Sequence, residues 1–184
     1  MKISISGIVG SGKTTISKMI SERYGCDCFS VGSIMREMAV ERSLTIQEFT
    51  EDAKKDSKID FELDRRQREL NEGSGNFVMD SRLGFYFIPD SFKIFLKIDL
   101  SEAARRIFEE KRYGERYENI KECLEFLEKR VASEKIRYKQ YYDVDFLNEG
   151  NFDLVLDSTN KSPEEIVEEI LEFIPNEGCN ENEG

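Results

Sequence analysis

The segment Gly7-Ile-Val-Gly-Ser-Gly-Lys-Thr14 constrains the fold of this chain more than any other feature of the sequence. It matches the pattern G-x-x-x-x-G-K-[ST] and lies between an alternating apolar stretch, residues 1–6, and a stretch with apolar residues at helical spacing. The glycines let the backbone wrap closely, so that successive N–H groups and the helix N-terminus face phosphate oxygens. A fortuitous glycine-rich turn is the alternative. Position and flanks instead favour a strand, a phosphate-binding loop and a helix.

The residues of this loop have separate expected roles. We expect Lys13 to reach the β- and γ-phosphates of ATP as a catalytic residue, and the Thr14 hydroxyl to bind Mg²⁺. Asp80 ends a predicted strand beside the strand of the loop, and we expect it to be the second magnesium ligand; the alternative is a simple strand-end aspartate. The expected ATP contacts are Gly7, Ile8, Val9, Gly10, Ser11, Gly12, Lys13, Thr14 and Thr15.

Strands alternate with helices along the rest of the chain. Short apolar runs predict the strands, and helical spacing with capping signals predicts the helices between them. The predicted strands are residues 1–6, 26–30, 76–80, 93–98 and 152–156. This order predicts an α/β protein with the P-loop NTPase fold, in which helices cover both faces of a five-stranded parallel sheet. Ligands then bind at the carboxyl ends of the strands.

The sequence also predicts how the chain is organised around this sheet. We expect one domain over residues 1–174, with an acceptor-binding insertion at about 31–72, a lid at about 112–141 and a disordered tail at 175–184. Two capping boxes mark helix starts, Thr45-Ile-Gln-Glu48 in the insertion and Ser162-Pro-Glu-Glu165 before the last helix.

Composition excludes several classes of function. The formal net charge of −11 argues against a nucleic-acid partner, and no apolar stretch of 18 residues is present, which argues against a membrane-spanning helix. The N-terminus does not resemble a secretory signal, so we expect a cytoplasmic protein. The absence of histidine removes the usual catalytic triads, and the four cysteines lack zinc-ligand spacing. We expect reduced thiols, with Cys26 and Cys28 on a buried strand.

The kind of phosphate acceptor is predicted from two observations, the absence of GTPase signatures and the positions of the arginines. The guanine-binding and switch signatures of a GTPase fail at Pro163 and at Leu83, so a GTPase is disfavoured. Arginines instead gather where the phosphate cleft is expected, at positions 36, 82, 112, 116, 130 and 137. Any one of them could be exposed surface. Together they predict an anionic acceptor and an arginine-bearing lid that excludes water during phosphoryl transfer.

Three segments carry a resemblance to a known family. They are Ser30-Val-Gly-Ser-Ile-Met-Arg36, Asp80-Ser-Arg-Leu-Gly84 and Arg130-Val-Ala-Ser-Glu-Lys-Ile-Arg-Tyr138. The chain resembles nucleoside monophosphate kinases, most closely cytidylate kinases of the archaeal type, from its start to about residue 174. The chain departs from the family at Ser33, where aspartate is common, and aligns poorly between residues 106 and 130.

The resemblance implies transfer of the γ-phosphoryl group of MgATP to CMP and dCMP. It implies that Arg36 and Arg82 bind the acceptor and that Arg130 and Arg137 close over the transferring group. It also suggests a monomer. A carboxylate can read the exocyclic amine of cytosine, which makes Asp64, with Asp60, a candidate for base recognition; solvated helix charges are the alternative. A kinase for UMP, AMP or another metabolite, or a non-catalytic ATP sensor, remains open.

Overall fold

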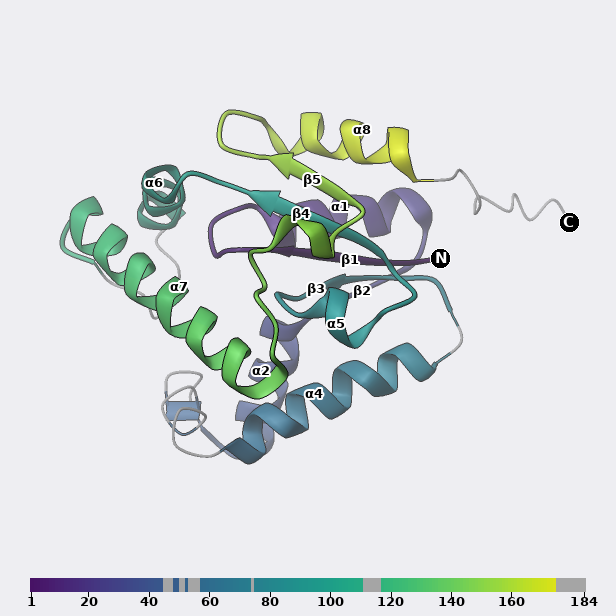
Figure 1. Ribbon diagram of the computed structural model, residues 1–184, viewed down its shortest axis with the longest axis horizontal. Coiled ribbons are helices and arrows are strands. Elements are labelled where there is room, and N and C mark those ends of the chain that lie inside the picture. The colour runs from purple at the N-terminus through teal and green to yellow at the C-terminus, as the bar shows by residue number, and fades with distance from the viewer. Residues whose placement is uncertain (45–47, 50–51, 53–56, 74, 111–116, 175–184) are drawn as a thin grey trace, which may run out of the picture.

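Five parallel strands form the centre of the molecule (Figure 1). The structure is a computed structural model, and it describes residues 1–44, 48, 49, 52, 57–73, 75–110 and 117–174. The strands are β1 (Lys2–Gly7), β2 (Asp27–Ser30), β3 (Phe77–Asp80), β4 (Phe92–Lys97) and β5 (Leu154–Asp157). Their order in the sheet is β2-β3-β1-β4-β5, and every neighbouring pair is parallel. The predicted α/β fold with a five-stranded parallel sheet is confirmed.

The helices lie on both faces of this sheet (Figure 1). Their bounds are α1 (Lys13–Tyr24), α2 (Val31–Glu41), α4 (Ser57–Glu72), α5 (Gly84–Phe87), α6 (Leu100–Glu110), α7 (Ile120–Tyr142) and α8 (Pro163–Phe173), with a 3₁₀ turn, η1 (Glu149–Asn151). The short elements α5 and η1 were not predicted, because three or four residues show no periodicity.

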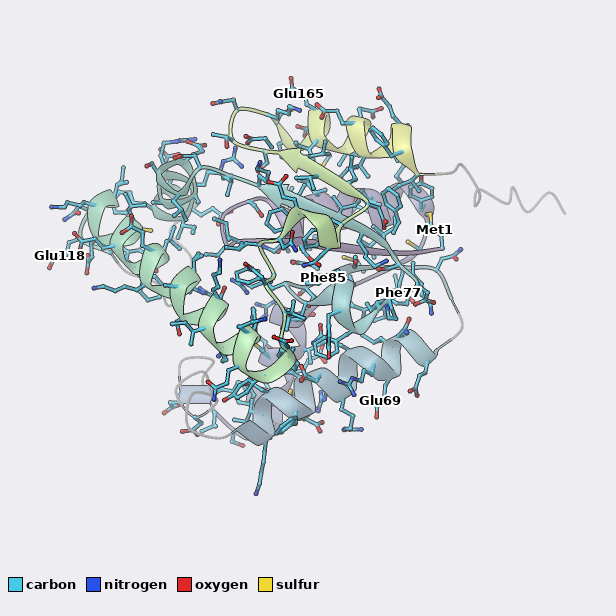
Figure 2. The ribbon with its side chains drawn as sticks, viewed as in Figure 1. Met1, Glu69, Phe77, Phe85, Glu118 and Glu165 are labelled. Atoms are coloured by element: carbon cyan, nitrogen blue, oxygen red, sulfur yellow. The ribbon has the colours of Figure 1, made fainter. Side chains whose placement is uncertain are left out.

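Alternation along the strands divides the core between the two faces. Val78 of β3 packs in one cluster with residues of α1 and α8, whereas Phe77 and Met79 pack in another with residues of α2, α4 and α5. Successive side chains of a strand point to opposite faces, so a strand covered on both sides is apolar throughout. Phe77 and Phe85 belong to the second cluster, whose side chains fill the layer between the sheet and α4 (Figure 2).

The sheet brings the ends of distant segments to one edge. Ser30 and Ile5 are the register partners of Asp80, and Gly7 is the partner of Leu96. The loops that follow β1, β2, β3 and β4 therefore start side by side, as the sequence predicts.

Helix starts agree with their predicted caps where they are described. Ser162 and Glu165 form the predicted capping box of α8, with the Ser162 side chain accepting from the Glu165 N–H and the Glu165 carboxylate accepting from the Ser162 N–H. The other predicted box, Thr45–Glu48, rests on residues 45–47, which lie outside the described residues. So do Arg112, Arg116 and the tail 175–184.

The cysteine prediction needs a correction. Cys28 is exposed and Cys26 is half-buried, so a buried strand is wrong for this pair. The reason is topological, because β2 is an edge strand of the sheet, so Cys28 on it is left exposed, and Cys26 lies just before it. Within the described part of the chain, no helix is long and apolar enough to cross a membrane.

Candidate active site

The loop between β1 and α1 has the backbone that a phosphate cradle requires. Gly7, Gly10 and Gly12 have φ of 146°, 88° and 87°, a region that side chains rarely adopt. A Cβ on Gly7 would lie 2.5 Å from the carbonyl oxygen of Leu96, and one on Gly10 would lie 2.9 Å from the Cβ of Ala103. The glycines are therefore needed both for the turn and for the close approach of β4 and α6.

The ammonium group of Lys13 lies within this loop. Its Nζ donates a hydrogen bond to the Ile8 carbonyl oxygen at 2.7 Å. Loss of hydration lowers the pKa of Lys13 to about 7, and the nearby Asp80 carboxylate only partly opposes this. A cation that has lost its water in this way gains strongly from an arriving phosphate anion, because charges interact more strongly where water is excluded.

Thr14 and Asp80 supply a pair of oxygen atoms at the mouth of the loop. The Thr14 hydroxyl donates to Asp80 Oδ2 at 2.6 Å, and Asp80 is largely buried at the end of β3. Magnesium prefers oxygen ligands and usually completes its shell with water and substrate phosphates. The hydroxyl and carboxylate oxygens of this pair are of the kind that magnesium prefers, and the described residues contain no group of three or more His, Cys, Asp or Glu side chains that could hold a metal ion.

Two of the predicted arginines meet on a carboxylate that has no role in the sequence prediction. Glu134 of α7 contacts Arg82 Nε with Oε2 at 2.8 Å and Arg130 Nε with Oε1 at 3.1 Å. Burial, the largest single influence, acts to lower the pKa of the Arg82 guanidinium, but Glu134, Tyr138 and Asp80 together outweigh it, so the pKa is raised. Both arginines and Glu134 lie close enough to Lys13 to act on its charge. Two side chains of α7, Arg130 and Glu134, therefore lie near the phosphate loop.

Arg137 lies further along α7, where it faces α4. Its guanidinium is 5.4 Å from the centre of the Tyr138 ring. Burial acts to lower the pKa of Arg137, and Tyr138 and Asp60 act in the opposite direction and prevail. Burial likewise raises the pKa of Asp60, with Arg137 opposing. The predicted pair of α4 carboxylates is therefore within electrostatic reach of the predicted lid arginine.

Asp64, one turn after Asp60, joins α4 to the end of α7. It is buried, and its Oδ2 accepts a hydrogen bond from the Tyr142 hydroxyl at 2.6 Å. Burial raises the pKa of Asp64, and the Tyr142 hydrogen bond partly opposes the increase. A buried, hydrogen-bonded carboxylate is a specific feature of the fold, in contrast to the solvated helix charge that was the alternative.

Arg36 is the predicted site residue that stays apart from this cluster. It is exposed, and within the described residues its side chain forms no ion pair. One of its terminal nitrogens lies 3.6 Å from where a Cβ on Gly32 would be, so the guanidinium folds back towards the start of α2. That start follows β2 directly, at the same edge of the sheet as Asp80.

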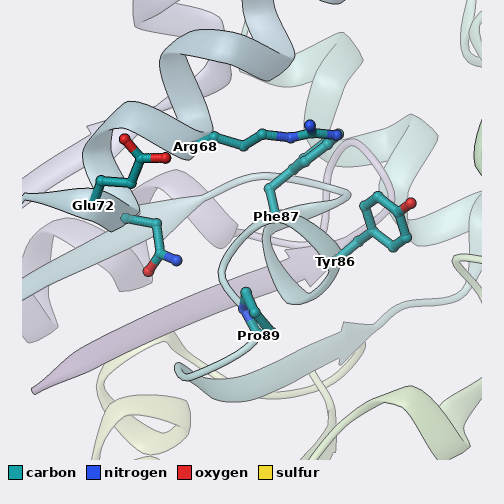
Figure 3. Close-up of a pocket in the computed structure, with 6 residues that line it drawn as sticks. Arg68, Glu72, Tyr86, Phe87 and Pro89 are labelled. Carbon is teal, nitrogen blue, oxygen red and sulfur yellow. The ribbon is translucent and has the colours of Figure 1, made fainter.

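A separate pocket of about 320 Å³ lies between the end of α4 and α5 (Figure 3). Arg68 lies over the Phe87 ring, with 5.3 Å between the guanidinium carbon and the ring centre, and Tyr86, Glu72, Asn71 and Pro89 complete the lining. None of the predicted site residues lines it.

Several side chains of the site were missed by sequence reasoning. Glu134 and Tyr142 make the contacts above, and Gln67 accepts a buried hydrogen bond from Ser81, the residue between Asp80 and Arg82, at 2.6 Å. Glu134 had a usable signal, since it stands four residues after Arg130 on a helix. Gln67 and Tyr142 had none, because their partners are distant in sequence.

The fold and the glycine-rich loop define the chain as a protein of the P-loop class. Among solved structures, shikimate kinase from Bacteroides thetaiotaomicron is similar with a TM-score of 0.66 at 15% identity, over 94% of this chain and 97% of that one. At that identity the likeness concerns the fold alone.

The chain belongs to the cytidylate kinase-like family, whose family model matches residues 2–160. It is 40% identical over 165 residues to a cytidylate kinase of Methanococcus vannielii, covering 86% of this chain and 91% of that protein. It is also 35% identical over 172 residues to an S-adenosylmethionine-dependent nucleotide dehydratase of Lacinutrix mariniflava, covering 93% of this chain and 35% of that longer protein.

Proposed function

We propose that this protein transfers the γ-phosphoryl group of MgATP to CMP and dCMP, with release of ADP and CDP or dCDP. The observation that carries the proposal is the meeting of Arg82 and Arg130 beside Lys13, because a phosphoryl-transfer site needs cations around both the donor and the acceptor phosphate. Membership of the cytidylate kinase-like family favours a cytidine monophosphate as the acceptor.

On the donor side, the proposal gives residues 7–15 to the ATP phosphates and Thr14 and Asp80 to Mg²⁺. A bound Mg²⁺ would neutralise negative charge as it develops on the transferring phosphoryl group. The chain's own residues position the triphosphate by backbone N–H groups and Lys13, and a phosphate anion beside Lys13 favours the charged form of its ammonium group.

On the acceptor side, Arg36 and Arg82 bind the monophosphate and Asp64 takes part in reading the base. Cytosine presents an exocyclic amine, a donor that a carboxylate accepts, next to ring acceptors. The buried Asp64 and the neighbouring Asp60 and Arg137 offer both kinds of group within one turn of α4 and its partner helix. Arg130 and Arg137 belong to the lid.

The test is a panel of acceptors with MgATP, assayed by ADP release: CMP, dCMP, UMP, AMP and shikimate, with a reaction lacking acceptor as the background. The expected result is that CMP or dCMP gives the highest kcat/KM. Omission of Mg²⁺ or its removal by a chelator should abolish turnover.

The other outcomes have distinct meanings. A higher kcat/KM for UMP, AMP or shikimate would contradict the assignment of the base and leave a P-loop kinase for a different acceptor. ATP binding without turnover on any acceptor would favour the non-catalytic sensor.

A further inference from the structure

Glu134 is a negatively charged side chain placed among the cations of a site that must bind negatively charged phosphates. Its side chain is 9% exposed. Arg82 and Arg130 are in direct contact with it, and Lys13 and Arg137 are near enough to respond to its charge. A carboxylate in this place repels a phosphate, so its presence calls for an explanation other than substrate binding.

The geometry of its two contacts offers one. Glu134 lies nearest to each arginine at Nε, the inner nitrogen of the guanidinium, and uses one oxygen for each. The contact with Arg130 is a hydrogen bond, whereas the contact with Arg82 is an ion pair in which Nε makes no hydrogen bond. Among the described residues, the terminal nitrogens of Arg82 and Arg130 have no hydrogen-bond partner, and these side chains remain 20% and 33% exposed. A guanidinium held at Nε still has its terminal nitrogens to donate to a phosphate.

Electrostatics point the same way. Two guanidinium groups brought together repel each other, and a largely buried ion is costly unless it is paired. One carboxylate between them removes both problems in the absence of nucleotide. It also fixes two long side chains that come from different elements, the loop after β3 and the middle of α7.

We propose that Glu134 is a positioning residue that holds Arg82 and Arg130 by their Nε atoms, so that their terminal nitrogens form one preset phosphate-binding surface. The proposal deepens the proposed kinase function and rests on it. Glu134 touches no reacting atom; it acts through the two arginines.

The first test is Glu134→Gln, which keeps the shape and removes the charge. An amide has a single acceptor oxygen, so one arginine is released and kcat should fall about 10- to 100-fold, as for misplaced catalytic groups. Removal of a negative charge beside two arginines should at the same time strengthen ground-state anion binding. We therefore expect the KM for the monophosphate to stay equal or fall, and inorganic sulfate to inhibit at about threefold lower concentration or less. A merely structural role predicts a higher KM, weaker sulfate inhibition and a lower melting temperature.

The matched control is Glu128→Gln, which removes the same charge from an exposed position on the same helix. It should leave kcat, KM and sulfate inhibition within about 1.5-fold of wild type, as expected for a surface charge. All assays use whichever monophosphate the wild type turns over fastest. A preference other than CMP then changes the proposed function and leaves this test intact.

A double-mutant cycle with Arg130→Ala checks that Glu134 acts through the arginines. If it does, the loss of kcat in the double variant is smaller than the product of the two single losses. Thermal shift with sulfate gives a readout independent of turnover, and Glu134→Gln should be stabilised more by sulfate than wild type.

Two results would overturn the proposal. One is a kcat for Glu134→Gln within twofold of wild type. The other is a loss of kcat in the double variant that equals the product of the losses in Glu134→Gln and Arg130→Ala. If Glu134→Gln does not fold, Glu134→Asp replaces it. That variant keeps the charge but is too short to reach both arginines, so kcat should fall without tighter sulfate binding, and an unchanged kcat counts against the proposal.

Discussion

The proposed site has a donor side and an acceptor side, and the two are built in different ways. The donor side is one continuous loop whose shape is fixed by backbone dihedral angles at Gly7, Gly10 and Gly12 and by close contact with β4 and α6. Apart from Arg36 of α2, the acceptor side consists of side chains from α4, α7 and the loop after β3, held by ion pairs and one tyrosine hydrogen bond. The first resists change because its atoms are packed; the second depends on charges that a substrate can replace.

This difference has a consequence for what each substitution should do. A change in the donor loop alters backbone geometry or an essential charge, so it should affect turnover with every acceptor. A change on the acceptor side should act mainly on the monophosphate, with little effect on the KM for MgATP.

The largest effect is expected for Lys13→Met. Removal of the cation should lower kcat by about 10²–10³-fold or more, as when a preorganised donor to a transition-state charge is lost. The same variant should raise the free energy of unfolding of the nucleotide-free protein by about 1–2 kcal/mol, because functional sites commonly sacrifice stability.

The pH dependence of that gain has a defined sign. The pKa of Lys13 is about 7 in the folded protein and 10.5 when unperturbed, so the lysine destabilises the fold fully below pH 7 and ceases to do so above pH 10.5. Melting temperatures of the two proteins should therefore differ more at pH 6 than at pH 9. A difference that grows with pH would contradict the burial of this cation.

The next effect in size is expected for Gly10→Ala. Its φ of 88° and the 2.9 Å approach of a new Cβ to Ala103 should together cost about 2–4 kcal/mol of unfolding free energy. Turnover should fall with all acceptors alike. Gly25→Ala is the matched control: φ is 59° but no atom lies within 4 Å of the new Cβ, so it should cost about 1 kcal/mol without changing kcat/KM. Equal costs at the two positions would show that the loop is not tightly packed.

The smallest effect is expected for Tyr142→Phe, which keeps the ring packed against Phe87 and removes only the hydrogen bond to Asp64. Loss of a hydrogen bond to a charged group should cost about 1.5–3 kcal/mol at most. The KM for the monophosphate should rise a fewfold while that for MgATP stays constant, as steady-state kinetics can measure. Tyr141→Phe, at the exposed neighbouring position, should change neither. A rise in the KM for MgATP with Tyr142→Phe would place Asp64 on the donor side.

Much of the fold could be predicted from the sequence because its signals are local. Strands such as β4 are short apolar runs, and α8 begins with its own capping box, so neither needs knowledge of distant residues. The error at Cys26 and Cys28 arose where local signals end. The strand that holds Cys28 and follows Cys26 was predicted, but its place at the edge of the sheet depends on the order in which the strands pair.

The donor half of the site was determined by the sequence itself. Eight consecutive residues, Gly7 to Thr14, specify the loop and predict its phosphate chemistry, since backbone N–H groups and glycine dihedral angles need no distant partner. The acceptor half was decided by the tertiary structure. The arginines at 82 and 130 could be listed in advance, but only the tertiary position of α7 brings Glu134 to both of them and Tyr142 onto Asp64. The physical reason is that the contact between Arg82 and Glu134 depends on how the loop after β3 and α7 are placed in space, which no local sequence pattern specifies.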